Sequence, residues 1–425
     1  MKKKRLLLFA YFYPPLGGPA VQRPLKVVKY LYDQGWETDV ISVKDIIYHS
    51  RDESLLKEDK AVGVYRTRSA DAMSFLKKTS SKGKLDARKI YFRTPEFLKR
   101  IVRSSFLIDD KFGWLKYAVK KAEELCEKYE YDAVMATVLP FTSAIAAYKI
   151  SKKFNLPLIV DFRDHWILNP FLPHLTPLHK AYAANWERKV LKRCSVVSVA
   201  GRIKGEDLIK RYGDHLTDKI QVMYNGWDEE DFKDIETSER ANSDFVISYI
   251  GSLYGKQSVK YFIQALVDLN SKRKLPSNLQ VRFVGNFYRE NLEVLTQNKL
   301  SDIISIIPQV DHARALQLMF DSDLLLLFYP DVDYKAMIMG KVFEYLQTGR
   351  NILAMLPENC ETAIILKEHE QNNICSMKDV RSIEEKLLKL FKTDRTAQSQ
   401  KKASKFYSRK HQVDLFAEKL DKLIK

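Results

Sequence analysis

The chain has 425 residues, of which 45% are hydrophobic, enough for two or three domains with sizeable cores. Its formal net charge of +17 favours anionic partners such as a nucleotide, a nucleic acid or a membrane surface. Its four cysteines are widely spaced, which argues against a disulfide framework or a zinc site and fits a reducing compartment.

The first residues, Met1–Arg5, are basic, but the apolar stretch behind them is too short for a signal peptide. The apolar run Leu6–Tyr11 leads into the segment YPPLGGPAVQRP, which contains Gly17 and Gly18. Glycine allows close approach to the backbone, and the flanking prolines stiffen the loop. This segment is either a loop that holds a ligand or a plain strand-to-helix turn.

Short apolar runs alternate with amphipathic stretches along the whole chain, as in parallel sheets whose two faces are covered by helices. The pattern predicts two doubly wound α/β domains in tandem, facing each other across a cleft. The predicted strands lie at residues 6–11, 38–43, 132–137, 157–162, 195–200, 221–225, 245–250, 280–285, 303–308, 324–329 and 351–356.

A strongly basic stretch runs from Ala72 to Arg103, with ten basic and two acidic residues and a net charge of +8. Apolar side chains are interleaved with these charges. Such a stretch can lie on an anionic membrane or meet nucleic-acid phosphates, and a solvated insertion is the third possibility.

The motif VDFRDHW places Asp161, Arg163, Asp164 and His165 at the end of a predicted strand. Buried charge is costly unless it is paired. The group is therefore either an internal Asp–Arg ion pair or a site for an acceptor or a sugar.

A polar, turn-rich segment at 225–244 marks the predicted domain boundary, and a second glycine loop, GSLYGKQ, follows the next strand. Neither glycine loop has the dinucleotide-binding or Walker pattern. Both still precede helices whose free N–H groups suit a phosphate.

The segment MGKVFEYLQTGRNILA places Lys341 in the first turn of a predicted helix and Glu344 one turn later. A lysine there opposes the helix dipole, so an anionic ligand would explain it. Glu344 is interpreted as an acceptor for two ribose hydroxyls or as a surface carboxylate. His312 is interpreted as structural, and no pair of histidines has metal-ligand spacing.

Five segments together resemble, in order and spacing, the family-4 retaining glycosyltransferases of the GT-B fold, and especially their bacterial surface-polysaccharide branch. They are YFYPPLGGPAVQRPLKVVKYL, DFRDHW, NGWDEEDF, YIGSLYGKQS and GKVFEYLQTGRNILAML. The resemblance implies an N-terminal Rossmann-like domain over 1–225, with the basic insert 72–103, and a C-terminal nucleotide-sugar-binding domain over 245–405. A helix over 406–425 would cross back to the N-terminal domain.

The resemblance also implies the roles of individual residues. Lys256, Arg163 and Asp164 are the expected catalytic residues. The family's E-x7-E motif matches only at its second glutamate, because Ala336 occupies the position of the first. The residues expected to bind the donor are Gly17, Gly18, Ser252, Lys256, Val310, Gly340, Lys341 and Glu344.

The expected activity is transfer of a sugar, of hexosyltransferase type, from a nucleotide sugar to a lipid-linked or oligosaccharide acceptor with retention of configuration. Cations and helix N-termini would stabilise the diphosphate leaving group, so no metal or other cofactor is expected. We expect a cytoplasmic protein at the inner face of the membrane with no nucleic-acid partner. Two alternatives stay open: a sugar-nucleotide 2-epimerase of the same fold, and a basic nucleic-acid-binding protein.

Overall fold

The computed structural model describes residues 3–44, 46, 48, 51–70, 106–172, 174–233, 235, 244–253, 256–392 and 404–424. The chain forms two compact units, one made of Met1–Asn225 with Arg409–Lys425 and the other of Gly226–Ser408. The basic stretch 72–103 lies outside the described residues.

The first unit is built on a seven-stranded parallel sheet with the strand order β3-β2-β1-β4-β5-β6-β7. Its strands are β1 (Lys4–Phe9), β2 (Trp36–Val43), β3 (Gly63–Thr67), β4 (Ala133–Val138), β5 (Leu158–Phe162), β6 (Cys194–Val199) and β7 (Ile220–Val222). Its helices are α1 (Pro19–Asp33), α5 (Leu115–Lys128), α6 (Thr142–Phe154), α7 (Pro177–Arg193), α8 (Arg202–Tyr212) and α15 (Arg409–Asp421), with short 3-10 turns η1 (Glu53–Lys57), η2 (Phe112–Trp114) and η3 (Asp214–Lys219).

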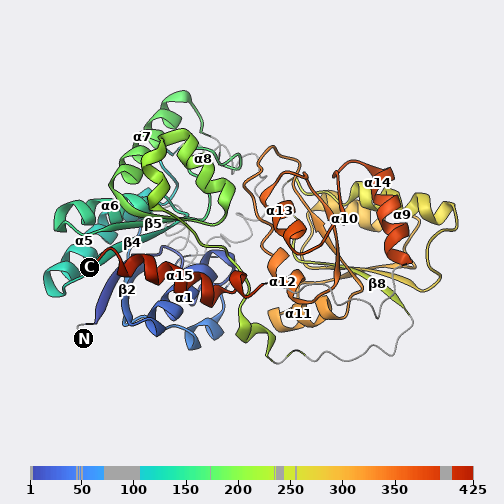
Figure 1. The fold of residues 1–425 in the computed structure, drawn as a ribbon, viewed down its shortest axis with the longest axis horizontal. Coiled ribbons are helices and arrows are strands. Elements are labelled where there is room, and N and C mark those ends of the chain that lie inside the picture. Colours follow the sequence, from blue (N-terminus) through green and yellow to red (C-terminus); the bar gives the residue numbers. More distant parts are fainter. Residues whose placement is uncertain are drawn as a thin grey trace, which may run out of the picture. The chain divides into compact units, whose positions relative to one another are not determined.

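Alternate residues of these strands enter two separate hydrophobic cores. In β1, Leu7 and Phe9 join the core that contains α5, α6 and α7, whereas Leu6 and Leu8 join the core that contains α1 and α15. The C-terminal helix α15 thus packs beside α1, which comes almost 400 residues earlier (Figure 1). Both faces of the sheet are covered, which explains why its strands are continuous apolar runs.

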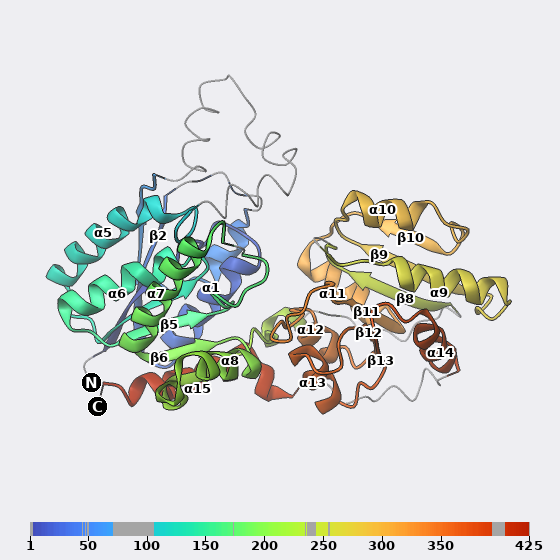
Figure 2. The ribbon, with the colours of Figure 1, turned by 90° about the horizontal axis from the view of Figure 1, so that it is seen from above.

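The second unit contains a six-stranded parallel sheet with the order β10-β9-β8-β11-β12-β13, and Figure 2 shows these strands in that order from top to bottom. Its strands are β8 (Phe245–Ile250), β9 (Leu279–Val284), β10 (Ile304–Ile307), β11 (Leu324–Phe328), β12 (Asn351–Met355) and β13 (Ile374–Cys375). Its helices are α9 (Lys260–Ser271), α10 (Arg289–Thr296), α11 (His312–Phe320), α12 (Val342–Gln347), α13 (Glu361–Glu368) and α14 (Val380–Phe391), with 3-10 turns η4 (Glu229–Phe232) and η5 (Lys405–Tyr407).

Both sheets have the strand order of a doubly wound fold, which confirms the predicted fold class for each unit. In such a sheet the order reverses beside the first strand, and ligands bind beyond the carboxyl ends of the strands at that point. The reversal lies between β1 and β4 in the first unit and between β8 and β11 in the second. The two glycine loops follow β1 and β8, so the fold places each at its sheet's reversal point.

Candidate functional site

In the second unit, two glycines follow adjacent strands and keep the backbone bare. Gly251 follows β8 with φ +131°, and Gly285 follows β9 with φ +136°. A Cβ added to Gly285 would lie 2.3 Å from the Gly251 carbonyl oxygen, and one added to Gly251 would lie 1.9 Å from Lys341 Nζ. Only glycine fits both the conformation and the space at these two positions.

The side chain of Lys341 fills the space that Gly251 leaves open. Lys341 is the residue immediately before α12, at the N-cap position, and not in the first turn as expected; its side chain forms no capping hydrogen bond. Its ammonium donates a hydrogen bond to Tyr249 Oη at 3.3 Å and lies 4.7 Å from the centre of that ring. Tyr249 in turn donates to the Ser252 carbonyl oxygen at 3.0 Å. Tyr249 therefore joins Lys341 and Ser252, two of the predicted donor-binding residues.

The Lys341 ammonium forms no ion pair with any residue that the structure describes. Burial lowers the pKa of Lys341 to about 8, and the nearby Glu344 carboxylate only partly opposes this effect. A cation held at a strand end without a paired carboxylate suits an anionic ligand.

Glu344 lies in the first turn of α12 and contacts a histidine from another element. Its Oε1 is 3.2 Å from Nε2 of His312, the first residue of α11. The sequence favours a structural role for His312, but the structure places it half-exposed against Glu344 at the same edge of the sheet. The sequence does not predict this contact, because the two residues lie 32 positions apart.

The remaining predicted residues of this unit lie on loops around Lys341. Lys256 is exposed, and no described side chain pairs with it. Its carbonyl oxygen accepts a hydrogen bond from Asp331 N at 3.1 Å, which joins the loop after β8 to the loop after β11. Val310, after β10, is partly buried, and Gly340, beside Lys341, is exposed with no atom within 4 Å of an added Cβ. Residues 254 and 255 of the glycine loop lie outside the described part.

Gln257 has a structural role next to Lys256. Its side chain is buried and donates to the carbonyl oxygen of Phe328, the last residue of β11, at 2.8 Å. Its own carbonyl oxygen accepts from Asn291 at 2.9 Å. Gln257 therefore ties β8 to β11 across the reversal point and holds the loop that carries Lys256.

In the first unit, the YPPLGGPAVQRP loop begins α1. Gly17 is buried, and Gly18 is the residue before the helix with φ +87°, a conformation that favours glycine. The segment's basic residue, Arg23, lies in α1 and contacts β5. Its Nε and Nη2 donate to the two carboxylate oxygens of Asp161 at 2.8 and 2.7 Å, and both side chains are buried.

Asp161 therefore belongs to a buried ion pair, and the partner is Arg23 instead of Arg163. Thr137 and Ser198 also donate to the Asp161 carboxylate, at 3.1 and 2.9 Å. Burial alone would raise the pKa of Asp161, but the Arg23 guanidinium and these hydroxyls hold it below its usual value. An internal Asp–Arg pair is one of the two interpretations of this motif. The motif does not show that the partner of Asp161 is an arginine 138 positions away.

The other polar residues of VDFRDHW connect β5 to α1 and α8. Arg163 Nη1 donates to the carbonyl oxygen of Ala20, in the first turn of α1, at 3.0 Å. Asp164 lies 3.9 Å from Lys204 of α8. His165 is buried 3.2 Å from the Lys204 carbonyl oxygen, and burial lowers its pKa to about 4. The structure thus places Arg163 beside the helix that Gly18 begins, whereas Lys256 belongs to the other unit.

The comparisons with known proteins bear on the first unit directly. Residues 25–231 match the family model described as Glycosyltransferase Family 4. The N-terminal unit is a glycosyltransferase family 4 domain. This match confirms the resemblance to glycosyltransferase family 4 for the sequence segments that lie within it. No curated protein sequence matches the chain.

Solved structures resemble both the family 4 domain and the second unit. A crystal structure of Anabaena HepE in complex with UDP has a TM-score of 0.64 and 16% identity, covering 99% of this chain and 100% of that one. A glycosyltransferase from Rickettsia africae has a TM-score of 0.67 and 15% identity, covering all of both chains. A putative UDP-N-acetylglucosamine 2-epimerase from Listeria monocytogenes has a TM-score of 0.57 and 11% identity, covering 97% of this chain and 95% of that one. At these identities the likeness establishes the fold, which is GT-B.

Two features are absent from the described residues. No three His, Cys, Asp or Glu side chains among them are arranged to hold a metal ion. None of their helices has the length and apolar character needed to cross a bilayer.

Proposed function

We propose that this protein transfers a sugar from a nucleotide-sugar donor to a lipid-linked glycan, with retention of configuration, in the synthesis of a surface polysaccharide. One observation carries the proposal: the Lys341 ammonium lies against the bare backbone of Gly251, at the reversal point of a doubly wound sheet, without an ion-pair partner among the described residues. A nucleoside diphosphate is the ligand whose charge and position this arrangement fits.

Each candidate site residue of the second unit has a distinct role in this proposal. Lys341 and Lys256 contact the diphosphate, and Glu344, oriented by His312, accepts hydrogen bonds from two ribose hydroxyls. The nucleobase lies against the backbone near Val310. The first unit contributes the Gly17-Gly18 loop and, on the acceptor side, the residues Arg163 and Asp164.

The reaction needs no enzymatic nucleophile in this proposal. The acceptor hydroxyl attacks the anomeric carbon on the face that the leaving group occupies, the bond from that carbon to the phosphate oxygen breaks, and the hydroxyl proton passes to the departing phosphate. New negative charge develops on the diphosphate, and the fixed lysine charges stabilise it in the transition state. The lysines supply this stabilisation without a metal, so chelators should leave the activity unchanged.

The donor site can be tested on the intact protein. A panel of nucleotide sugars should contain one that raises the melting temperature, because a ligand selective for the native state stabilises it by mass action. Replacing Lys256 or Glu344 by alanine should abolish transfer from that donor while the circular dichroism spectrum is kept. Lys260→Ala, an exposed lysine at the start of α9, is the matched control. Full activity in Lys256→Ala or Glu344→Ala would refute the site assignment.

A second candidate, a nucleotide-sugar 2-epimerase, is favoured by the structural likeness to the Listeria monocytogenes protein. The two activities differ in their products. A transferase releases the nucleoside diphosphate in proportion to the acceptor supplied, whereas an epimerase converts one nucleotide sugar into another without an acceptor. Product analysis with and without acceptor distinguishes them.

We also propose that the protein works at the inner face of the cytoplasmic membrane. The net charge of +17 and the basic stretch 72–103 support this location. Replacing the ten lysines and arginines of that stretch by glutamine should weaken co-sedimentation with anionic vesicles, because each basic residue near the surface contributes about 1 kcal/mol. Unchanged co-sedimentation of this variant would exclude a docking role for the stretch.

A further inference from the structure

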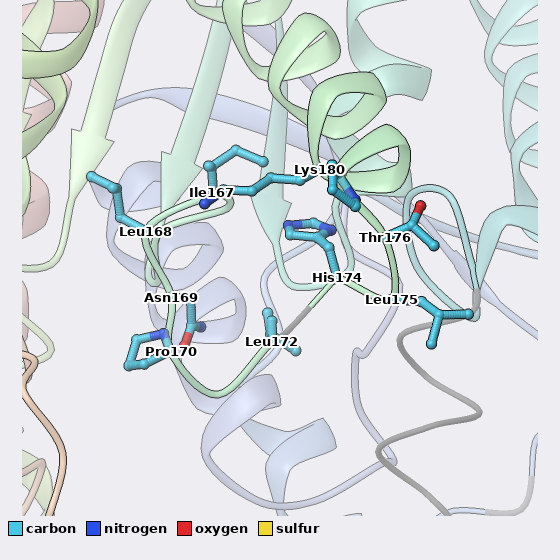
Figure 3. A pocket seen from close by; sticks show the side chains of 10 residues that line it. Ile167, Leu168, Asn169, Pro170, Leu172, His174, Leu175, Thr176 and Lys180 are labelled. Carbon is cyan, nitrogen blue, oxygen red and sulfur yellow. The ribbon is translucent and has the colours of Figure 1, made fainter.

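A pocket of about 510 Å³ is formed by the connection from β5 to α7 in the first unit, and its lining side chains are mostly apolar (Figure 3). Of its lining residues, Lys180 is exposed, whereas Nε2 of His174 is buried. The pocket therefore does not bring charged groups together as a binding site does. The connection from β11 to α12 in the second unit, which ends at Lys341, is instead organised by hydrogen bonds.

This β11–α12 connection is held against its neighbours along its backbone. Tyr329, its first residue, donates a hydrogen bond from its hydroxyl to the Tyr334 carbonyl oxygen. Glu361 N, at the start of α13, donates to the Lys335 carbonyl oxygen at 2.9 Å. Ala336, the next residue, is buried. The first part of the connection is thus fixed before the chain reaches Lys341.

Thr362, in the first turn of α13, contacts the next part of the connection with its side chain. Its hydroxyl donates to the Met337 carbonyl oxygen at 3.2 Å and accepts a hydrogen bond from Met339 N at 3.0 Å. The side chain is fully buried. One hydroxyl therefore bridges two backbone groups, and it does so by acting as donor and acceptor at once.

Met339 connects Thr362 to the start of α12. The Met339 carbonyl oxygen accepts a hydrogen bond at 2.8 Å from the backbone N of Val342, the first residue of α12. Lys341 lies inside this turn, and Gly340 contributes no side chain to it. The hydrogen bonds at Met339 therefore set where the Lys341 side chain leaves the backbone.

The Lys341 ammonium needs this support because its position costs hydration. Burial lowers the pKa of Lys341 to about 8, so the ammonium would gain solvation if the turn moved outward. Among the described residues, Tyr249 and Glu344 are the titratable groups that face it. The tyrosine hydroxyl is one neutral partner, and the carboxylate only partly opposes the effect of burial. Contacts elsewhere must therefore hold the turn.

We propose that Thr362 is a positioning residue of the donor site, because its hydroxyl fixes the turn at Met339 and so keeps the Lys341 ammonium against Gly251. Without the hydroxyl, the backbone groups of Met337 and Met339 lose their partner, and the turn relaxes toward solvent. The use of Lys341 to bind a diphosphate rests on the proposed function, but the position of the ammonium can be measured in the ligand-free protein.

Nuclear magnetic resonance titration of the lysine ε-carbons in the full chain, without ligand, follows this position. The Lys341 signal is the one missing from Lys341→Met, and in the unmodified protein it should titrate near pH 8. Thr362→Val keeps the shape of the side chain and loses the hydroxyl. It should raise the midpoint by about one pH unit or more, because a hydrated ammonium returns toward its ordinary pKa.

Two other substitutions at the same position separate the hydroxyl from the rest of the side chain. Thr362→Ser keeps the hydroxyl and should keep the midpoint of the unmodified protein. Thr362→Cys carries a thiol, which is a weak donor and acceptor, and should give a midpoint between those of Thr362→Ser and Thr362→Val. The serine and cysteine variants also decide the matter if Thr362→Val does not fold.

Thr348, at the other end of α12, offers a matched control. Its hydroxyl donates to the Tyr345 carbonyl oxygen at 2.6 Å and accepts from Arg350 N at 3.1 Å, and the side chain is buried. Thr348→Val therefore removes the same two kinds of hydrogen bond from the same helix. It should lower the melting temperature much as Thr362→Val does and leave the Lys341 titration unchanged.

Binding of inorganic pyrophosphate, measured by calorimetry at neutral pH, tests the consequence for the donor site. The affinity should fall about tenfold in Thr362→Val and stay within about twofold in Thr362→Ser and Thr348→Val. Equal titration shifts in Thr362→Val and Thr348→Val, an unchanged midpoint in Thr362→Val, or an ordinary lysine midpoint in the unmodified protein would overturn the inference. If pyrophosphate does not bind the unmodified protein, the proposed donor site fails, while the lysine titration still decides the role of Thr362.

Discussion

The two reversal points of this protein share a topology and differ in how their charges are used. In the first unit, Arg23 is neutralised by Asp161 within the protein. In the second, Lys341 lies at the strand ends with a tyrosine hydroxyl and a glycine backbone as its described neighbours, and its pKa is lowered. The same fold thus holds one cation as part of its core and leaves another for a ligand.

This difference separates charges that support the fold from charges that bind. A buried pair such as Arg23–Asp161 is costly to break, because removing one member leaves the other uncompensated. A cation with a lowered pKa and no paired carboxylate weakens the folded state slightly, and stability is commonly traded for function in this way at binding sites.

The largest effect is expected for the buried ion pair. Arg23→Met should lower the free energy of unfolding by about 3–5 kcal/mol, because the Asp161 carboxylate would stay buried without its partner. Urea unfolding followed by near-ultraviolet circular dichroism measures this. Lys153→Met, which breaks the exposed Lys153–Glu123 pair, is the control and should cost at most about 1 kcal/mol.

The pH dependence of this effect has a definite sign. The pair holds the pKa of Asp161 below its unfolded value, so its stabilisation is present above about pH 4 and is lost as the pH falls through the folded pKa. The difference between Arg23→Met and the unmodified protein should therefore shrink in acid. Equal losses in Arg23→Met and Lys153→Met at neutral pH would show that the pair is not structural.

The sequence predicts most strands but not all of them. Each of the eleven apolar runs overlaps a strand. Most of these strands are buried on both faces, and such strands form continuous apolar segments. The two strands that the pattern misses, β3 and β13, are at sheet edges. β3 is partly exposed and contains Arg66, and β13 has only two residues, so neither has enough apolar periodicity to be recognised.

Some site residues are likewise indicated by the sequence, whereas their contacts are not. Gly251, Lys341 and Glu344 lie in local motifs, so a single stretch of sequence indicates them. The contacts that orient Lys341 and Glu344, with Tyr249 and His312, join segments that are far apart in the sequence and depend on long-range packing. Local patterns show which residue types are present, whereas the tertiary fold decides whether Arg23 or Arg163 pairs with Asp161.

The next largest loss of stability and affinity is expected for alanine variants of two glycines at the second reversal point. Gly251→Ala should cost about 1–3 kcal/mol of stability through its positive φ, and it should also displace the Lys341 ammonium. We therefore expect the affinity for the nucleoside diphosphate selected by the thermal screen to fall about tenfold or more. Gly285→Ala should destabilise at least as much, because its Cβ meets backbone instead of a flexible side chain.

Gly35→Ala, in the first unit, is the matched control for these variants, since its φ of +80° imposes a similar backbone strain and nothing lies within 4 Å of its added Cβ. It should lose stability and keep the affinity for the diphosphate. If Gly251→Ala bound the diphosphate as tightly as Gly35→Ala does, Lys341 would not be the diphosphate ligand.

The smallest effect is the pH dependence of donor binding, and it tests the free cation directly. Burial lowers the pKa of Lys341 to about 8, and a bound diphosphate should raise it again, so the protonated protein binds the donor. Affinity should then be constant below pH 8 and fall above it, by at most about tenfold per pH unit. The diphosphate of a nucleotide sugar is fully ionised from pH 7 to 9, so the change belongs to the protein. Lys341→Met should bind weakly with a flat profile, and a fall of the same slope in that variant would assign the titration to another group.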